Sequence, residues 1–211
     1  TKSNIRQFNK TGELTDVQDI MSFSPDTLHV VPVICSPEKD ADFIWSQADY
    51  QSIRQYFAAL TELSVTTALT SHPVNVMQVA NIGSLLLNRQ KKTYLCGAGI
   101  FELSVSSNGD VYPCFAFIGS AEMLMGNVHN DSNLQEDSRF QSVRSRLLSN
   151  AYSKIPSCKE CWLKGLCSNC IGNAYEINGS ISNPLEVICE AQRSMFETAL
   201  MGCGETLGLL S

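Results

Sequence analysis

The sequence predicts an α+β chain, in which a helix-rich first part is followed by a cysteine-rich second part with a β-hairpin. Apolar residues recur at helical spacing in the first part, and a strictly alternating segment with an Asn-Gly turn follows it. The cysteines are unevenly placed. None of the nine lies between Cys35 and Cys96, whereas seven lie from Cys96 to Cys189.

Composition and charge exclude several classes of protein. The 211 residues are 44% hydrophobic and 17% charged, which is typical of a globular chain and not of a disordered or collagen-like one. A formal net charge of −6 gives no basic footprint for nucleic acid. No apolar run reaches the roughly 18–20 residues of a membrane span, and no secretory signal is visible. We therefore expect a cytoplasmic protein that binds neither nucleic acid nor membrane.

The first part predicts one β/α unit. The β-branched run over residues 28–34 is typical of a strand buried on both faces, although Pro32 cannot donate to a ladder. Ser46, with Asp49 three positions later, predicts a helix start, and apolar residues at helical spacing extend that helix over residues 47–63. One unit cannot close a sheet, so this part is either the tail of a larger α/β domain or incomplete as a fold.

Apolar periodicity predicts three further helices. They lie within residues 74–95, over residues 133–149 and from about Cys189 onward. The first of them ends in a basic cluster that includes Lys91 and Lys92, which we interpret as a solvated face.

A β-hairpin is predicted between these helices. Residues 100–106 alternate apolar with polar side chains, Asn108-Gly109 supplies the positive φ that a tight turn requires, and residues 110–114 return. Because Cys96 precedes the first strand and Cys114 ends the second, the turn folds these two cysteines back toward each other. Such a pair forms either a disulfide or two ligands of one metal site.

The strongest chemical signal is a run of four cysteines within 13 residues. Disulfides are disfavoured, because a reducing compartment is expected and this spacing closes very small, strained loops. Four thiolates suit zinc, but zinc ribbons usually separate their two pairs by roughly a dozen residues or more. Iron–sulfur ligation leads, since it also accounts for Cys96, Cys114 and Cys189. The run consists of Cys158, Cys161, Cys167 and Cys170.

This cysteine spacing resembles that of the seven-cysteine SPASM domain, the C-terminal half of radical S-adenosylmethionine (SAM) enzymes that modify peptides and proteins. The resemblance covers roughly residues 94–195. Where the family usually has three residues between its fifth and sixth cysteines, this chain has two. The pattern is Cys96-x12-Gly109-x4-Cys114, then Cys158-x2-Cys161-x5-Cys167-x2-Cys170, then Cys189, with the family-like segments Asn108-Gly109-Asp110-Val111-Tyr112-Pro113-Cys114 and Gly126-Asn127-Val128.

The resemblance implies two auxiliary 4Fe–4S clusters. By motif position, Cys96, Cys114 and Cys170 would hold the first cluster. A set of three cysteines leaves one iron open to a solvent molecule, another protein ligand or a substrate thiol. Cys35 and Cys203 are spare. The second cluster would be held by Cys158, Cys161, Cys167 and Cys189.

The same resemblance implies two domains. Residues 1–92 look like the last β/α unit of a partial radical-SAM barrel with a connecting helix, and residues 93–211 look like the SPASM domain. The Cys-x3-Cys-x2-Cys triplet that binds the catalytic cluster in such enzymes is absent from this sequence. S-adenosylmethionine and its cluster would therefore belong to a preceding part, and this chain by itself is not expected to be an active enzyme.

The resemblance implies that the chain is the auxiliary-cluster domain of a radical SAM enzyme. Such an enzyme would install a thioether or other cross-link in a ribosomally made precursor peptide. Sulfatase-maturing relatives carry an aspartate directly after the second cysteine, where this chain has Phe115, which disfavours formylglycine formation. Expected partners are the precursor peptide, an external electron donor and the barrel portion acting in trans. No catalytic residue is assigned, and Glu102, on the polar face of the hairpin, contacts either solvent or a peptide. The alternative is a zinc-binding protein-interaction module without redox chemistry.

Overall fold

The computed structural model describes residues 14–34, 44–130 and 133–206, with side chains as far as residue 202. The chain divides into two compact units: residues 92–185 form one, and the residues before and after them form the other. Cys35 and the side chain of Cys203 lie outside the described residues. Among the helices of the described part, none is both long enough and apolar enough to cross a membrane.

The unit formed by the two ends of the chain is helical in its described part, and it confirms the predicted amphipathic helices. The predicted helix over 47–63 begins with a short 3-10 turn and runs four residues further than expected. Ser46 donates its backbone N–H and its hydroxyl to the Asp49 carboxylate, at 3.0 and 2.7 Å, so the expected helix start is also confirmed. The elements are α2 (Thr15–Met21), η2 (Gln47–Asp49), α3 (Tyr50–Thr67), α4 (Met77–Leu87) and α8 (Glu186–Thr206).

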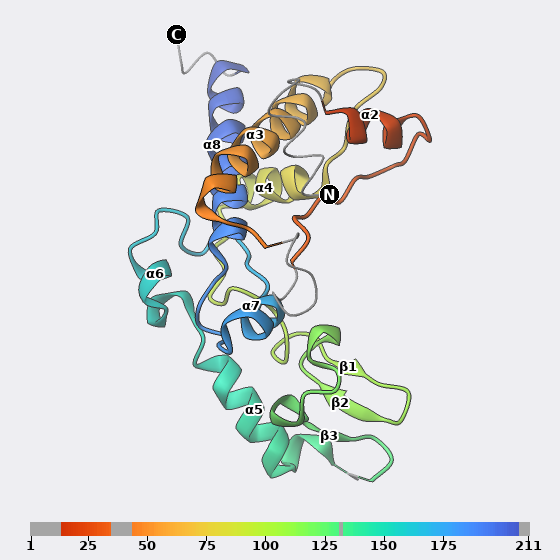
Figure 1. Cartoon of the computed structure of the whole chain (residues 1–211), viewed down its shortest axis with the longest axis vertical. Coiled ribbons are helices and arrows are strands. Elements are labelled where there is room, and N and C mark those ends of the chain that lie inside the picture. Colours follow the sequence, from red (N-terminus) through yellow and green to blue (C-terminus); the bar gives the residue numbers. More distant parts are fainter. Residues whose placement is uncertain (1–13, 35–43, 131–132, 207–211) are drawn as a thin grey trace. The chain divides into compact units, whose positions relative to one another are not determined.

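Helices α3 and α8 lie side by side and form the core of this unit (Figure 1). The inner face of α3 is fully buried at Ile53, Phe57 and Leu60, and α8 buries Met195 and Phe196. Each of these side chains stabilises the folded state by about 1.5–3 kcal/mol relative to an exposed position. Apolar burial, and not polar pairing, therefore holds the two helices together.

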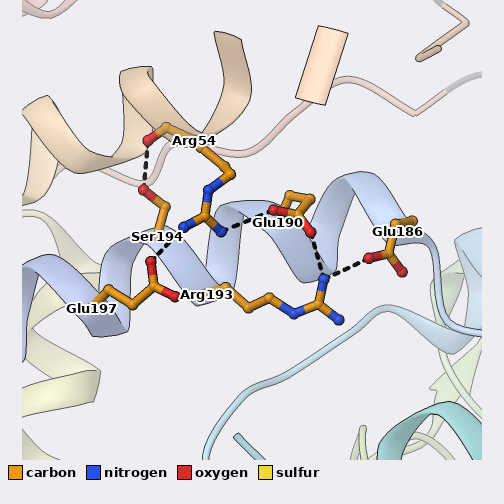
Figure 2. Close-up of polar contacts among 6 residues, drawn as sticks. All are labelled: Arg54, Glu186, Glu190, Arg193, Ser194 and Glu197. Carbon is orange, nitrogen blue, oxygen red and sulfur yellow. Dashed lines mark hydrogen bonds and ion pairs between the residues drawn. The ribbon is translucent and has the colours of Figure 1, made fainter. Parts of the chain in front are cut away.

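A polar network lies along one edge of this helix pair (Figure 2). Arg54 of α3 donates to Glu190 of α8 at 2.9 Å and also pairs with Glu197, while Arg193 holds the other oxygen of Glu190 at 2.5 Å. The Ser194 hydroxyl donates to the backbone carbonyl of Arg54. Because these ion pairs are partly exposed, they fix the register of the two helices more than they add to stability.

The expected strand over residues 28–34 is wrong, since the segment makes a single parallel bridge. Leu28 lies opposite Val76 in this bridge, where it donates its N–H to the Asn75 carbonyl and accepts the Met77 N–H, both at 2.8 Å. Val31 is 60% exposed, so the segment is not buried on both faces. Pro32 has no N–H, and within the described residues the run has no backbone bridge besides that of Leu28, so its β-branched residues do not extend a ladder.

The unit of residues 92–185 contains the predicted hairpin, which has shorter strands than expected and gains a third (Figure 1). Strands β1 (Ser104–Val105), β2 (Asp110–Tyr112) and β3 (Gly126–Asn127) pair antiparallel in that order. Gly109 has a φ of +85°, which the tight turn requires. Phe101 is 81% exposed, so the apolar side of the alternating segment faces outward there.

The rest of this unit is helical and packs around one apolar core. Asp137 begins the predicted helix of residues 133–149 by accepting the backbone N–H of Arg139 at 2.7 Å. Phe117, Met123 and Leu147 are almost fully buried in the core. The elements are η3 (Phe115–Phe117), η4 (Ala121–Met123), η5 (Leu134–Glu136), α5 (Ser138–Leu148), η6 (Tyr152–Lys154), α6 (Pro156–Lys159) and α7 (Ile171–Asn178).

Candidate metal centre

The seven cysteines of the predicted motif are thiols and form no disulfide in the described part of the chain. In those residues, no three His, Cys, Asp or Glu side chains converge closely enough to hold one metal ion. The donor set consists of thiols, and the thiolate is the ligand that holds iron–sulfur clusters in proteins, so the chemistry of these residues fits such a cluster.

One group of sulfurs, called here the first sulfur group, consists of Cys96, Cys114 and Cys170. Burial raises the pKa of the Cys96 thiol, and the neighbouring charge of Cys170 raises it further. Burial likewise raises the pKa of Cys114, to which the charges of Cys96 and Cys170 add. Three cysteines that are far apart in the sequence thus lie within electrostatic reach of one another. For Cys96 and Cys114, this proximity is what the predicted hairpin led us to expect.

Each sulfur of the first sulfur group accepts a backbone hydrogen bond. The amide two residues further along donates to Cys96 and to Cys114, and the amide of Ile171 also reaches Cys96. Asn173 donates its N–H to the Cys170 sulfur at 3.5 Å, at the start of α7. Such N–H groups favour the charged thiolate, and hydrogen bonds to sulfur help to set the reduction potential of an iron–sulfur cluster.

Two glycines allow the three segments of the first sulfur group to meet. The Gly99 N–H donates to the carbonyl of Pro113 at 3.0 Å, which ties the loop after Cys96 to the end of the hairpin. A Cβ added at Gly172 would lie only 2.5 Å from the Cβ of Ala116, so α7 approaches η3 more closely than any side chain allows. Backbone contact between these segments therefore fixes the spacing of the sulfurs.

A carboxylate lies beside the first sulfur group. The charge of Glu102 raises the pKa of both Cys96 and Cys114, after the larger effects of burial and of the other cysteines. The loop places it there, because Gly99 donates its N–H to the Glu102 carbonyl at 2.9 Å and Ala98 pairs with Glu102 in a β-bridge. The sequence placed this residue on a polar strand face and did not indicate that the chain turns back here.

The second sulfur group consists of Cys158, Cys161 and Cys167, and it is built by one short loop. Burial raises the pKa of Cys167 to about 11, with the charges of Cys158 and Cys161 contributing. The Cys161 N–H donates to the Cys158 carbonyl at 3.2 Å, and the Cys167 N–H donates to the Leu163 carbonyl at 3.3 Å. Local turns thus bring these three sulfurs together.

The buried side chain of Tyr152 contacts the second sulfur group at Cys167. Its hydroxyl donates to the Cys167 carbonyl at 2.5 Å and lies 4.0 Å from the Cys167 sulfur. Burial and then the charge of Cys167 raise the pKa of Tyr152 far above its usual range, so the hydroxyl stays protonated and acts as a donor. No spacing rule marks a tyrosine 15 residues away, so the sequence did not indicate this contact.

Lys92 also contacts the loop of the second sulfur group. Its backbone N–H donates to the Gly165 carbonyl at 2.7 Å, and its ammonium donates to the Ser168 hydroxyl at 2.6 Å. The Lys92 charge acts to lower the pKa of Cys167. The interpretation of Lys92 as part of a purely solvated face is therefore incomplete, because its charge acts on a sulfur.

Cys189 lies on α8, in the unit formed by the two ends of the chain, and is partly buried. Its described neighbours there include Tyr50, whose pKa is raised first by burial and then by charges that include Cys189. Its place in a ligand set stays a prediction.

A known protein family matches part of the chain. The model of the SPASM domain, an iron–sulfur cluster-binding domain, matches residues 96–162. The match contains Cys96, Cys114, Cys158 and Cys161, and the later cysteines follow it. No curated protein sequence matches the chain.

Solved structures of the sulfatase-maturating enzyme anSMEcpe share the fold. A structure with bound AdoMet and the Kp18Cys peptide is 17% identical, with a TM-score of 0.63, and is matched over all of this chain and 56% of its own. A structure with bound AdoMet alone is 18% identical, with a TM-score of 0.63 and 55% of its own chain matched. This chain therefore spans little more than half the length of these solved chains.

The family comparison and the structural comparison point to the same kind of protein, although they cover different lengths of the chain. The family model covers the segment from the first motif cysteine to the loop of the second sulfur group, and the structural match extends over both units. The resemblance predicted from the cysteine spacing is thereby confirmed: residues 96–162 match a SPASM iron–sulfur cluster-binding domain, within a chain whose fold is similar to that of a radical SAM/SPASM maturating enzyme.

Proposed function

We propose that this chain holds two auxiliary 4Fe–4S clusters for a radical SAM enzyme that cross-links a ribosomally made peptide. The first sulfur group would bind one cluster, and the second sulfur group, completed by Cys189, would bind the other. The observation that carries this proposal is the sorting of six thiols into two separate groups of three. Cys189 is assigned from the resemblance alone.

Each cluster would have a distinct task. A cluster with four cysteines is suited to electron transfer, since no iron is left for another ligand. A cluster with three cysteines leaves one iron that can take a donor from a substrate, which suits the positioning of a peptide thiol. Phe115, directly after Cys114, is 79% exposed and carries no carboxylate, which supports thioether formation over formylglycine formation.

The rest of the enzyme remains part of the proposal. Residues 1–92 would be the last part of a radical-SAM barrel, and the preceding barrel would supply S-adenosylmethionine and the catalytic cluster. A peptide substrate is supported by the structural neighbours that hold the Kp18Cys and Cp18Cys peptides. An external reductant and a cytoplasmic location complete the proposal.

Metal and sulfide analysis tests this function. After anaerobic reconstitution, two cubane clusters require about eight iron and eight sulfide per chain. Cys114→Ala and Cys161→Ala should each leave about four iron, while Cys203→Ala, outside both sets, should keep about eight. About one zinc per chain without sulfide would overturn the proposal and favour the zinc-binding interaction module.

The peptide part needs its own assay. The chain would be combined with the barrel portion, S-adenosylmethionine, a reductant and a cysteine-containing precursor peptide. A cross-link appears in mass spectrometry as a loss of about two hydrogens, together with one thiol fewer available for alkylation. An unchanged peptide mass with both clusters present would exclude cross-linking while leaving the cluster assignment intact.

A further inference from the structure

Within the described residues the first sulfur group contains three cysteines, and Glu102 follows one of them on the same short loop. The loop of residues 97–102 folds back on itself, because Gly99 bonds the Glu102 carbonyl and Ala98 bridges to Glu102. The amide of Ala98 in turn donates to the Cys96 sulfur. One short loop therefore carries both a cysteine of the group and the carboxylate.

We propose that the Glu102 carboxylate is the fourth, exchangeable ligand of the cluster held by the first sulfur group. This inference rests on the proposed function, because it needs that cluster to be present. The Gly99 N–H is shared between the Glu102 carbonyl at 2.9 Å and the Pro113 carbonyl at 3.0 Å, so the backbone of Glu102 lies next to the residue that precedes Cys114. Glu102 thus follows the loop that begins at Cys96 and shares the Gly99 donor with the residue before Cys114, a position from which a fourth donor can be supplied.

The chemistry of a carboxylate suits an exchangeable position. Oxygen is a harder donor than sulfur and binds the soft, thiolate-rich irons of a cluster less well than a thiolate does. An incoming thiol could therefore displace Glu102, whose released carboxylate would accept the thiol proton. No electrons change hands in this exchange. Iron–oxygen and sulfur–hydrogen bonds break, and iron–sulfur and oxygen–hydrogen bonds form.

The surroundings of Glu102 leave room for such an exchange. Glu102 is exposed, and so are Phe101, which precedes it in the chain, and Phe115, which follows Cys114, with exposed fractions of 81% and 79%. Glu102 thus lies at the surface, while the three cysteines of the first sulfur group are partly buried. A ligand at the surface can be replaced without unfolding the loop that holds it.

A thiol titration followed by EPR spectroscopy of the reduced clusters tests this inference. The variants are Glu102→Ala, Glu102→Gln and Glu102→Cys, with Glu136→Ala as the matched control, since Glu136 is an exposed carboxylate on η5 of the same unit. Free cysteine should change the spectrum of Glu102→Ala and Glu102→Gln at concentrations at least about tenfold lower than in the wild type. Glu102→Cys should not respond, and Glu136→Ala should match the wild type.

The outcomes separate the two proposals. Equal midpoints for the wild type, Glu102→Ala and Glu102→Gln, with about eight iron in each, would overturn the role of Glu102 and leave the proposed function standing. A wild-type chain without iron and sulfide would overturn both. If Glu102→Ala retains only about four iron, a ligand role requires Glu102→Cys to restore the missing cluster. Failure to restore it would make Glu102 structural and overturn the inference.

Discussion

The two sulfur groups lie in the same unit but are built in different ways. The first sulfur group joins three segments of the chain, through a close approach of α7 to η3 at Gly172. The second sulfur group lies within a single segment of ten residues, which includes the end of α6, and the Tyr152 hydroxyl donates to the last of its three cysteines. A site made by tertiary packing can be lost when one distant contact fails, whereas a site made by a local loop depends on few residues outside it.

The largest expected effect is the loss of the first cluster alone. Gly172→Ala places a Cβ 2.5 Å from that of Ala116, so α7 must move away and carry Cys170 with it. We expect about four iron per chain in place of about eight, with the second cluster unchanged, as measured by iron analysis and EPR spectroscopy.

Gly83→Ala is the matched control for this substitution. Gly83 lies in α4 with nothing within 4 Å of an added Cβ, so the exchange should stabilise the chain by up to about 1 kcal/mol and keep all the iron. Gly172 also lies in a helix, where alanine is intrinsically favoured. A Gly172→Ala chain that keeps both clusters would contradict the account of close backbone packing.

A smaller effect, confined to the second cluster, is expected from Tyr152→Phe. The change removes the donor to the Cys167 carbonyl and costs about 1–3 kcal/mol if that carbonyl stays buried without a partner. About half of the iron should then be released to a chelator several times faster than from the wild type. Release at the wild-type rate would show that the hydroxyl does not hold the loop.

Tyr175→Phe is the matched control for Tyr152→Phe. Its hydroxyl donates to Glu122 at 2.7 Å on the exposed side of α7, and its ring lies against Phe117. Removing this exposed hydrogen bond should leave the second cluster as stable as in the wild type. Faster loss of the second cluster in Tyr175→Phe would mean that the two sulfur groups are not independent.

The sequence predicted the local features of this site well and its tertiary features poorly. The hairpin that folds Cys96 back toward Cys114 follows from alternation and an Asn-Gly turn, and the capped helix starting at Ser46 follows from its own side chains. The residues that neighbour the sulfurs could not be predicted in this way. Tyr152 and Glu102 come close to the cysteines because the backbone turns back on itself, and periodicity does not show such turns. The strand expected at residues 28–34 failed for the same reason, since a ladder depends on a partner segment that periodicity does not reveal.

The smallest predicted effect concerns the electrostatics of the second sulfur group. The ammonium of Lys92 acts on Cys167 and is fixed by the Ser168 hydroxyl. Removing a positive charge near a cluster disfavours its reduced, more negative state, so Lys92→Met should lower the reduction potential of the second cluster. Because the lysine is exposed and water screens its charge, we expect a shift on the order of tens of millivolts.

The neighbouring lysine makes this last comparison selective. Lys91→Met removes the same charge one position earlier, where the structure describes no hydrogen bond to the loop of the second sulfur group. A redox titration followed by EPR spectroscopy should show a shift for Lys92→Met, little change for Lys91→Met, and the first cluster unchanged in both. Equal shifts in the two variants would mean that only net charge matters. The Lys92–Ser168 contact would then have no specific electrostatic role, and the two clusters would differ in their ligands alone.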